Sequence, residues 1–430
     1  MDNRVSDLDV IRTDRSVKGI LSYIVLTSIY LTGQYIETGI GFTIYWFYFP
    51  YAFLIFLGIV KDSKFDLRIL LFLVALVIFS LATFQYGFPL VIKQLFNISF
   101  SLFAFYYLIK FEQFNFPAIL SKYIQISKVV LVLGYVQVFL FAIGGDQYFG
   151  FVFPFVRETN ISIRMQSIAT EPSFLTLGLT PVVFLSLYNL FYRRTFYLNW
   201  KWCLLFVGGY LLTLASTAYL GLLLMLAILY FKNFSVRKFL WSIGALTGIF
   251  LFVILAYSFI PLIKERVDDT VMGLRGNFVQ NGKYREYNLS TYILLSNFHV
   301  VKQSLKDRPL TGYGLGTHEL TYDHYLPAEM RAYSSLNRND AGSMAFRLIT
   351  ETGILGLFVF CFFTLRYRIR SRAWFSDEEE ILWIINASAF VLIFLYLLRN
   401  GNYTFNGKML FMLLYFYSYK AIVMTKKIER

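Results

Sequence analysis

The amino-acid sequence predicts an all-α polytopic membrane protein with about twelve transmembrane helices. The 430 residues are 57% hydrophobic and 20% aromatic but only 15% charged, and their mean hydropathy is +0.57. Soluble domains are about 45–50% apolar and about 25% charged, so this composition excludes an ordinary soluble globular protein. The apolar runs are also continuous rather than alternating, which favours helices over a β-barrel.

Twelve apolar runs of membrane-spanning length follow one another along the chain. They cover residues 18–36, 40–60, 67–84, 89–111, 125–143, 172–192, 201–215, 216–231, 239–261, 344–365, 380–399 and 406–424. The seventh and eighth runs divide near Ser216 and Thr217, which leaves one long helix with a re-entrant turn as an alternative. The first run follows a mixed-charge tail and directly precedes another run, so we expect an anchor rather than a cleaved signal peptide.

The distribution of basic residues predicts how the spans are oriented. One side of the predicted topology holds 24 of the 40 Lys and Arg residues, and the short loops of the other side hold 4. Cytoplasmic loops carry such an excess, so both termini are predicted to be cytoplasmic. The formal charge of +14 is spread over these loops rather than gathered on one face, which argues against nucleic-acid binding.

This map divides the chain into three regions. Residues 1–261 hold the first nine spans, residues 262–343 form an extracytoplasmic loop domain, and residues 344–430 hold the last three spans. A loop of that length is expected to have structure and function of its own. It contains all three histidines, His299, His318 and His324, and a helix is expected over residues 290–305 before a turn at 307–309.

Two motifs in the loop domain have a functional and an ordinary interpretation. Glycine occupies every second position from Gly312 to Gly316, which suits either a phosphate-binding nest or a flexible turn. His318, Glu319, Asp323 and His324 either bind a metal or are an ordinary polar surface, and we expect the ordinary surface. Neither a metal nor a cofactor is predicted.

Charged residues also gather at the outer ends of the spans. Arg164 and Glu171 precede Pro172, whose missing N–H suits the first turn of a helix, so Glu171 is either a helix-start residue or a functional acid. Arg347 and Glu351 lie four residues apart, where a mutual salt bridge is the simple alternative to a role in binding.

Two further cations lie at membrane depth. Arg399 ends the eleventh span, and Lys93 begins the fourth, where its ammonium can reach the membrane surface. Guanidinium groups bind phosphate oxygens in a bidentate manner and keep their charge. Arginines beside carboxylates at an outer membrane surface therefore suggest a phosphate-bearing substrate such as a lipid-linked pyrophosphate.

The order of these segments resembles the O-antigen polymerase and ligase superfamily of bacterial membrane glycosyltransferases. The resemblance covers most of the chain and rests on the large loop between the ninth and tenth spans and on three motifs. The motifs are Arg164 with 171–173 (EPS), 307–316 (DRPLTGYGLG) and 351–357 (ETGILGL). Ligase relatives usually carry a His-Asn pair where residues 339–343 here read NDAGS, which favours polymerase over ligase. An arginine often found about fifteen residues before the loop proline is replaced by Leu294.

The resemblance implies transfer of a glycan from undecaprenyl pyrophosphate to a sugar hydroxyl of the next lipid-linked repeat unit. It implies that arginines hold the pyrophosphate and that an acid deprotonates the hydroxyl. The candidate binding residues are Arg164, Arg347, Arg399, Arg308, Arg285 and Tyr313, and the candidate bases are Glu171, followed by Asp340 and His318.

Two rival functions remain open at the level of the sequence. One is an O-antigen ligase that joins the polymer to the lipid A core. The other is a flippase or transporter, which would place charges near the membrane midplane and repeat one half of its fold. The expected partners are undecaprenyl-pyrophosphate-linked glycans, membrane lipids, and by family likeness a chain-length regulator and a flippase, with the active site facing the periplasm of a bacterial inner membrane.

Overall fold

In the computed structural model of the chain, the described residues are mostly helical. It describes residues 17–37, 43–61, 65–83, 87–145, 164–232, 289–327, 337–370 and 375–428, together with 148, 257–258, 264, 268, 271, 279–280 and 283–284. In this part of the chain five helices are long and apolar enough to cross a membrane: α4 (Phe88–Phe111), α5 (Phe116–Ala142), α7 (Pro172–Tyr192), α14 (Met344–Arg366) and α15 (Asp377–Arg399). The predicted all-α membrane protein is thereby confirmed, whereas the twelve spans and their orientation stay predictions.

Shorter elements complete the described fold. Four are apolar helices, α2 (Tyr48–Lys61), α3 (Leu67–Thr83), α8 (Trp200–Leu212) and α9 (Ser216–Phe231). The others are α1 (Val17–Thr27), α12 (Leu289–Asp307), α13 (His318–Tyr325), the 3-10 helix η3 (Phe405–Gly407) and α16 (Lys408–Ile428). Two antiparallel hairpins pair β1 (Tyr35–Glu37) with β2 (Thr43–Tyr45) and β3 (Val279–Gln280) with β4 (Lys283–Tyr284).

Side chains just before the helices determine where several of them begin. The Asn115 side chain accepts a hydrogen bond from the Ala118 amide at the start of α5, and Ser376 and Glu379 form a capping box before α15. Such caps satisfy amides that have no partner within the helix. Pro172 occupies the first turn of α7, as predicted, because it has no amide hydrogen to satisfy.

Some predicted spans differ from the observed helices. The first run, 18–36, is helical only to Thr27, since the chain then turns through Gly33 into the β1–β2 hairpin, and the second run begins its helix at Tyr48 rather than at 40. Gly33 has a φ of 90°, and a Cβ atom there would lie 2.7 Å from Thr170 Oγ1. The fifth helix begins earlier than predicted, at Phe116, because Asn115 caps it. The predicted break between α8 and α9 is confirmed, and the predicted span 239–261 lies outside the described residues.

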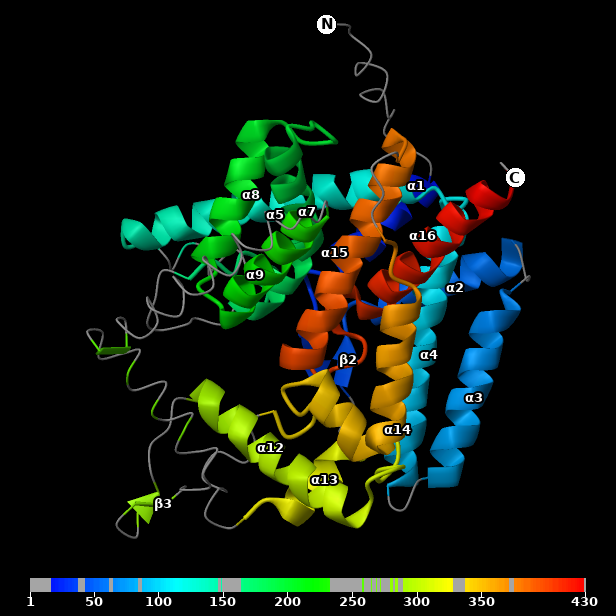
Figure 1. The fold of residues 1–430 in the computed structure, drawn as a ribbon, viewed down its shortest axis with the longest axis vertical. Helices are drawn as coiled ribbons and strands as arrows, with labels where there is room; N and C mark the ends of the chain where they lie inside the picture. The colour runs from blue at the N-terminus through cyan, green and yellow to red at the C-terminus, as the bar shows by residue number, and fades with distance from the viewer. Residues whose placement is uncertain are drawn as a thin grey trace, which may run out of the picture.

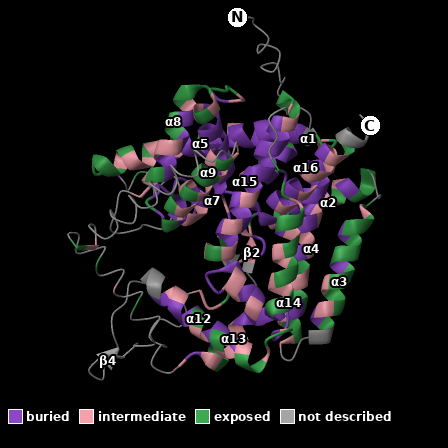
Figure 2. Cartoon of the chain, viewed as in Figure 1, coloured by how far each residue is buried: buried purple, intermediate pink, exposed green. Residues whose placement is uncertain are grey.

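The helices differ in how deeply they are buried. α7 and α15 are buried along most of their length, whereas α3 and α14 expose apolar side chains (Figure 2). We therefore assign α7 and α15 to the protein core and the exposed faces of α3 and α14 to lipid.

The two ends of the molecule carry different structure. α12 and α13 lie at one end, and α1 and the C-terminus lie at the other (Figure 1). α12 and α13 pack against the first turns of α14, and together with the segment between them they form what we call the cap, residues 289–327. We call its end of the molecule the cap end and the other the opposite end.

Candidate functional site

The buried polar centre of the cap end is built on the first turns of α14. The Ser343 hydroxyl caps this helix by accepting from the Phe346 amide at 3.3 Å. One turn later, Arg347 Nε donates to Glu351 Oε1 at 2.8 Å. The exposed fractions of the two side chains are 7% and 0%, so the ion pair is closed to solvent. The salt bridge considered from the sequence is confirmed.

Residues from other parts of the chain also bond to this ion pair. The two terminal nitrogens of Arg347 donate to the Gly401 carbonyl at 3.2 Å and to Gln94 Oε1 at 2.9 Å. The guanidinium also lies 4.5 Å from the centre of the Tyr403 ring, whose hydroxyl donates to Glu351 Oε2 at 3.0 Å. Arg347 thereby joins α4, α14 and the segment before α16. Its donors are used within the protein, so it positions these elements and does not present itself to a substrate.

The segment that follows α15 supplies a cation that sequence reasoning missed. Lys408 is fully buried at the start of α16, and its ammonium donates to the backbone carbonyls of Asn400, at 2.9 Å, and Asn402. It also lies 4.5 Å from the centre of the Tyr396 ring. Its hydrogen-bond partners are neutral, and Arg347 and Asp340 are the charged groups within electrostatic range of it. The signal in the sequence was the polar run RNGNYTFNGK at 399–408, between two apolar helices.

A second residue of this run, Asn406, ties it to the core helices. Its backbone has a φ of 52°, and its side-chain amide donates to the Phe174 carbonyl of α7 at 3.1 Å. Its oxygen accepts from Asn400 at 3.2 Å, and its carbonyl accepts from the Tyr396 hydroxyl at 2.8 Å. The start of α7, the end of α15 and the start of α16 therefore meet at one residue.

The glycine-rich segment 309–316, which we call the strap, lies across a break in α14. Gly353 interrupts the helix with φ 67° and ψ −169°. The amides of Tyr313 and Gly314 donate to the carbonyls of Thr350 and Glu351, both at 2.9 Å, and the Ile354 amide donates back to the Pro309 carbonyl at 2.9 Å.

Two glycines make this backbone contact possible. A Cβ atom on Gly353 would lie 2.2 Å from the Leu310 carbonyl oxygen, and one on Gly312 would lie 2.6 Å from the Glu351 backbone. Side chains at either position would separate the strap from α14. The Tyr313 and Gly314 amides of the strap are therefore bonded to α14, and a phosphate nest would lack these two donors.

His318 is held inside the cap. Its Nδ1 lies 2.9 Å from the Thr350 hydroxyl and its Nε2 lies 3.0 Å from Asn297 Oδ1. Burial, with the positive charge of Arg347, lowers the pKa of His318 to about 3. A neutral ring satisfies both contacts by donating from Nε2 and accepting at Nδ1. The prediction that His318 is a candidate base is therefore not supported, because the ring is enclosed and is a weak proton acceptor.

Two acidic residues of the cap, Glu319 and Asp323, form ion pairs with Arg338. Arg338 Nε donates to Asp323 Oδ1 at 2.7 Å, and its NH1 donates to Glu319 Oε1 at 2.5 Å. These carboxylates raise the pKa of Arg338. No group of three or more metal-binding side chains occurs among the described residues, and Glu319 and Asp323 already hold an arginine. The ordinary interpretation of this motif fits the structure better than the metal site.

Two predicted residues of the strap region also contact each other. The Arg308 guanidinium is half-buried and lies 5.5 Å from the centre of the Tyr313 ring. Tyr313 is buried, and its hydroxyl bonds to that of Tyr325, which donates to Asp307. Tyr313 therefore fixes the strap, and Arg308 is the more accessible of the two predicted residues.

Asp340 and Arg399 flank the buried centre. The Asp340 carboxylate accepts from Asn337 Nδ2 at 2.7 Å and from the Gly342 amide at 3.0 Å, and it lies within electrostatic range of Arg347 and Lys408. Arg399 is half-buried, and no acceptor for it occurs among the described residues. It is one residue away from Asn400, which binds Lys408. The structure thus brings Asp340 to the centre and leaves the Arg399 guanidinium available.

The remaining predicted residues lie around α7, with one exception. Arg164 Nε donates to the Thr213 carbonyl at 3.3 Å, and the Thr213 hydroxyl accepts from Thr176 of α7 at 2.9 Å. Glu171 is exposed at the start of α7, where it accepts from Ser173 at 3.1 Å. Lys93 is exposed, as predicted, and Arg285 lies outside the described residues.

The chemical capacity of the cap end follows from these contacts. A neutral histidine, a closed Arg347–Glu351 pair and the strap give it a rigid frame. Of the predicted binding residues at this end, the half-buried Arg399 and Arg308 have no carboxylate partner among the described residues. Fixed cations of this kind stabilise negative charge that develops on a leaving group. No model of a known protein family matches this chain, and no curated protein sequence matches it at a significant level.

Proposed function

We propose that this protein polymerises undecaprenyl-pyrophosphate-linked oligosaccharide repeat units into O-antigen or a related surface polysaccharide. In this reaction the growing glycan leaves its lipid pyrophosphate and joins a hydroxyl of the next repeat unit, at the outer face of the bacterial cytoplasmic membrane. The observation that carries the proposal is the docking of the strap on the break in α14. That contact joins two of the three motifs of the superfamily resemblance beside a cationic, membrane-embedded centre.

Arginines would stabilise the departing pyrophosphate. Arg399 is our first choice, because its guanidinium is half-buried and has no acceptor among the described residues. Arg308 and Arg164 follow, since each is half-buried and has only weak or backbone partners. Loss of one such donor typically lowers the rate about 10²–10³-fold. Arg347 acts through Tyr403 and the Gly401 carbonyl as a positioning residue.

An acid would take the proton of the acceptor hydroxyl. Glu171 remains the first choice, because its carboxylate is exposed at the start of α7 and the same helix contacts Asn406 of the polar run. Asp340 is the second choice, since it lies near Arg347 and Lys408. His318 is no longer a candidate.

Deletion of the gene followed by electrophoresis of the surface polysaccharide tests the function. A polymerase deletion leaves the core with one repeat unit. Bare core with accumulated lipid-linked polymer indicates a ligase, and single units trapped inside the cell indicate a flippase. A ladder of normal length in the deletion strain contradicts all three functions.

Complementation with variants tests the site. Glu171→Ala and Arg164→Ala are each expected to abolish the ladder at unchanged protein level. Asp377→Ala is the matched control, because this carboxylate is 71% exposed at the far end of the bundle and should leave the ladder intact. A full ladder with Glu171→Ala removes that residue from the proposal and moves the role of the base to Asp340.

A further inference from the structure

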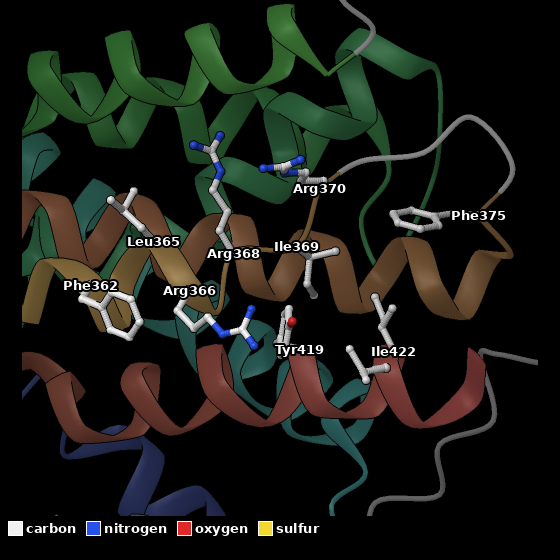
Figure 3. A pocket seen from close by; sticks show the side chains of 10 residues that line it. Phe362, Leu365, Arg366, Arg368, Ile369, Arg370, Phe375, Tyr419 and Ile422 are labelled. Atoms are coloured by element: carbon white, nitrogen blue, oxygen red, sulfur yellow. The ribbon is translucent and has the colours of Figure 1, made fainter. Parts of the chain in front are cut away.

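A cavity of about 510 Å³ lies at the end of α14 that is away from the cap. It is bounded by the last turns of α14 and α16 and by the short segment between α14 and α15 (Figure 3). Its charged wall consists of Arg366, Arg368 and Arg370, and its apolar wall includes Phe362 and Ile422. The volume is within the range of about 300–1,000 Å³ that is usual for ligand sites.

The three arginines have no carboxylate partner among the described residues. The Arg368 guanidinium lies 4.4 Å from the centre of the Phe390 ring, a cation–π contact. Arg366 reaches toward Tyr419, while Arg368 and Arg370 extend to the other side of the ribbon (Figure 3). By contrast, Arg194 in another loop pairs with Glu380 at 3.2 Å. The Arg366 guanidinium therefore faces the cavity, and Arg368 and Arg370 add positive charge beside it that is unpaired among the described residues.

An apolar stripe leads along α14 to these arginines. Phe358, Phe362 and Leu365 are 64%, 59% and 68% exposed, and their spacing of four and three residues puts them on one helix face. In a membrane protein such a face lies against acyl chains. The stripe ends at Arg366, so an acyl chain on it would have its headgroup at the cavity. This arrangement favours a lipid phosphate over a free phosphate ion.

We propose that this cavity binds the phosphate headgroup of an anionic phospholipid. Guanidinium groups match phosphate oxygens in geometry and charge, and basic pockets between membrane helices on the cytoplasmic side suit anionic lipids. The predicted topology puts residues 366–372 on that side. The bound lipid contacts both α14 and α16 and thereby stabilises their packing.

Thermal unfolding of the full chain in a neutral detergent tests the proposal. Added phosphatidylglycerol is expected to raise the unfolding temperature by a few degrees, because a ligand of the folded state stabilises it. Phosphatidylcholine and inorganic phosphate at the same concentration should give no rise. An equal rise with phosphatidylcholine would mean that only the apolar stripe binds, and a rise with inorganic phosphate would mean a free-anion site. Either result overturns the proposal.

Variants locate the binding site. Combined Arg366→Gln, Arg368→Gln and Arg370→Gln changes should remove the rise, and so should Val423→Trp, which fills the cavity and keeps the charges. The matched control combines Arg68→Gln and Lys201→Gln, two exposed cations in the first turns of α3 and α8, and should keep the whole rise. If either the triple arginine variant or Val423→Trp fails to fold, the other variant tests the site. A rise that persists in a folded test variant contradicts the proposal.

Discussion

Two clusters of charged side chains, at opposite ends of the helix bundle, differ in their balance of charge. At the cap end Arg347 is directly bonded to one carboxylate, Glu351, whereas Lys408 is bonded to backbone carbonyls. At the opposite end Lys232 and Arg194 share two carboxylates, Glu380 and Asp377.

The balanced cluster joins three helix ends. Lys232 Nζ lies 2.7 Å from both Glu380 Oε1 and the Tyr188 hydroxyl, and 4.8 Å from the centre of the Trp383 ring. Arg194, in the loop after α7, lies 3.2 Å from Glu380 Oε2. These contacts join the ends of α7 and α9 to the start of α15, and every cation has an anion.

The difference indicates what each cluster is built to do. A balanced cluster holds helices together and attracts no further ion. The cap-end cluster bonds Lys408 to carbonyl groups, with the Asp340 carboxylate at longer range, and leaves Arg399 without an acceptor among the described residues. Such a surplus attracts an anion, and four experiments can break or sharpen this comparison.

The largest effect is expected from removing the carboxylate that is bonded to Arg347. Glu351→Ala leaves the Arg347 charge enclosed, and breaking a buried pair in this way costs about 3–5 kcal/mol in the free energy of unfolding. Denaturation in detergent measures the loss. Glu380→Ala should cost less, because the buried Lys232 keeps its bond to the Tyr188 hydroxyl and Arg194, which is 46% exposed, keeps Asp377 and can turn to solvent. An equal or larger loss for Glu380→Ala would break the comparison.

A loss of activity without a loss of stability is expected for Arg399→Gln. If Arg399 binds the pyrophosphate, the polymerisation rate should fall about 10²–10³-fold, which is equivalent to about 3–4 kcal/mol. Arg194→Gln at the opposite end should leave the rate unchanged. Rates measured with lipid-linked repeat units in detergent check both variants, and normal activity of Arg399→Gln would remove this residue from the site.

A smaller effect on stability is expected where the strap meets α14. Gly353→Ala adds a Cβ atom only 2.2 Å from the Leu310 carbonyl oxygen, and it does so at a residue whose φ is 67°. We therefore expect the free energy of unfolding to fall by about 1–3 kcal/mol. Limited proteolysis of the cap should become faster. Gly145→Ala is the control, because the nearest atoms to its Cβ lie at 3.5 Å. Unchanged proteolysis of Gly353→Ala would mean that the strap does not need this close contact.

The free energy of unfolding should decrease at acidic pH, because His318 is buried as a neutral ring. Its folded pKa, about 3, is below the unfolded value of 6.5, so the unfolded chain binds one more proton between these pH values. The stability is complete above pH 6.5 and falls as the pH decreases toward 3, by about 1.4 kcal/mol per pH unit. Unfolding of the wild type and His318→Asn at pH 7 and pH 5 should show about 2 kcal/mol less acid sensitivity in the variant. Equal sensitivity would contradict a buried neutral ring.

The sequence predicted the features that depend on spacing. Arg347 and Glu351 lie one helical turn apart, so their ion pair was foreseeable, and Pro172 marked the start of α7. The role of Lys408 was not foreseeable, because its partners are backbone carbonyls, and any residue type supplies those. The enclosure of His318 was also hidden, since Asn297 and Thr350 are 21 and 32 residues away from it.

Composition and the spacing of charges by themselves determined that this protein is helical and embedded in lipid, because the preference of a side chain for hydrocarbon or water is its own property. They also determined which cations are near which helix end. Only the tertiary structure decided which of these charges are neutralised. That outcome depends on distant segments, such as the strap on α14 and Asn406 on α7, whose backbone groups meet only after the helices have packed.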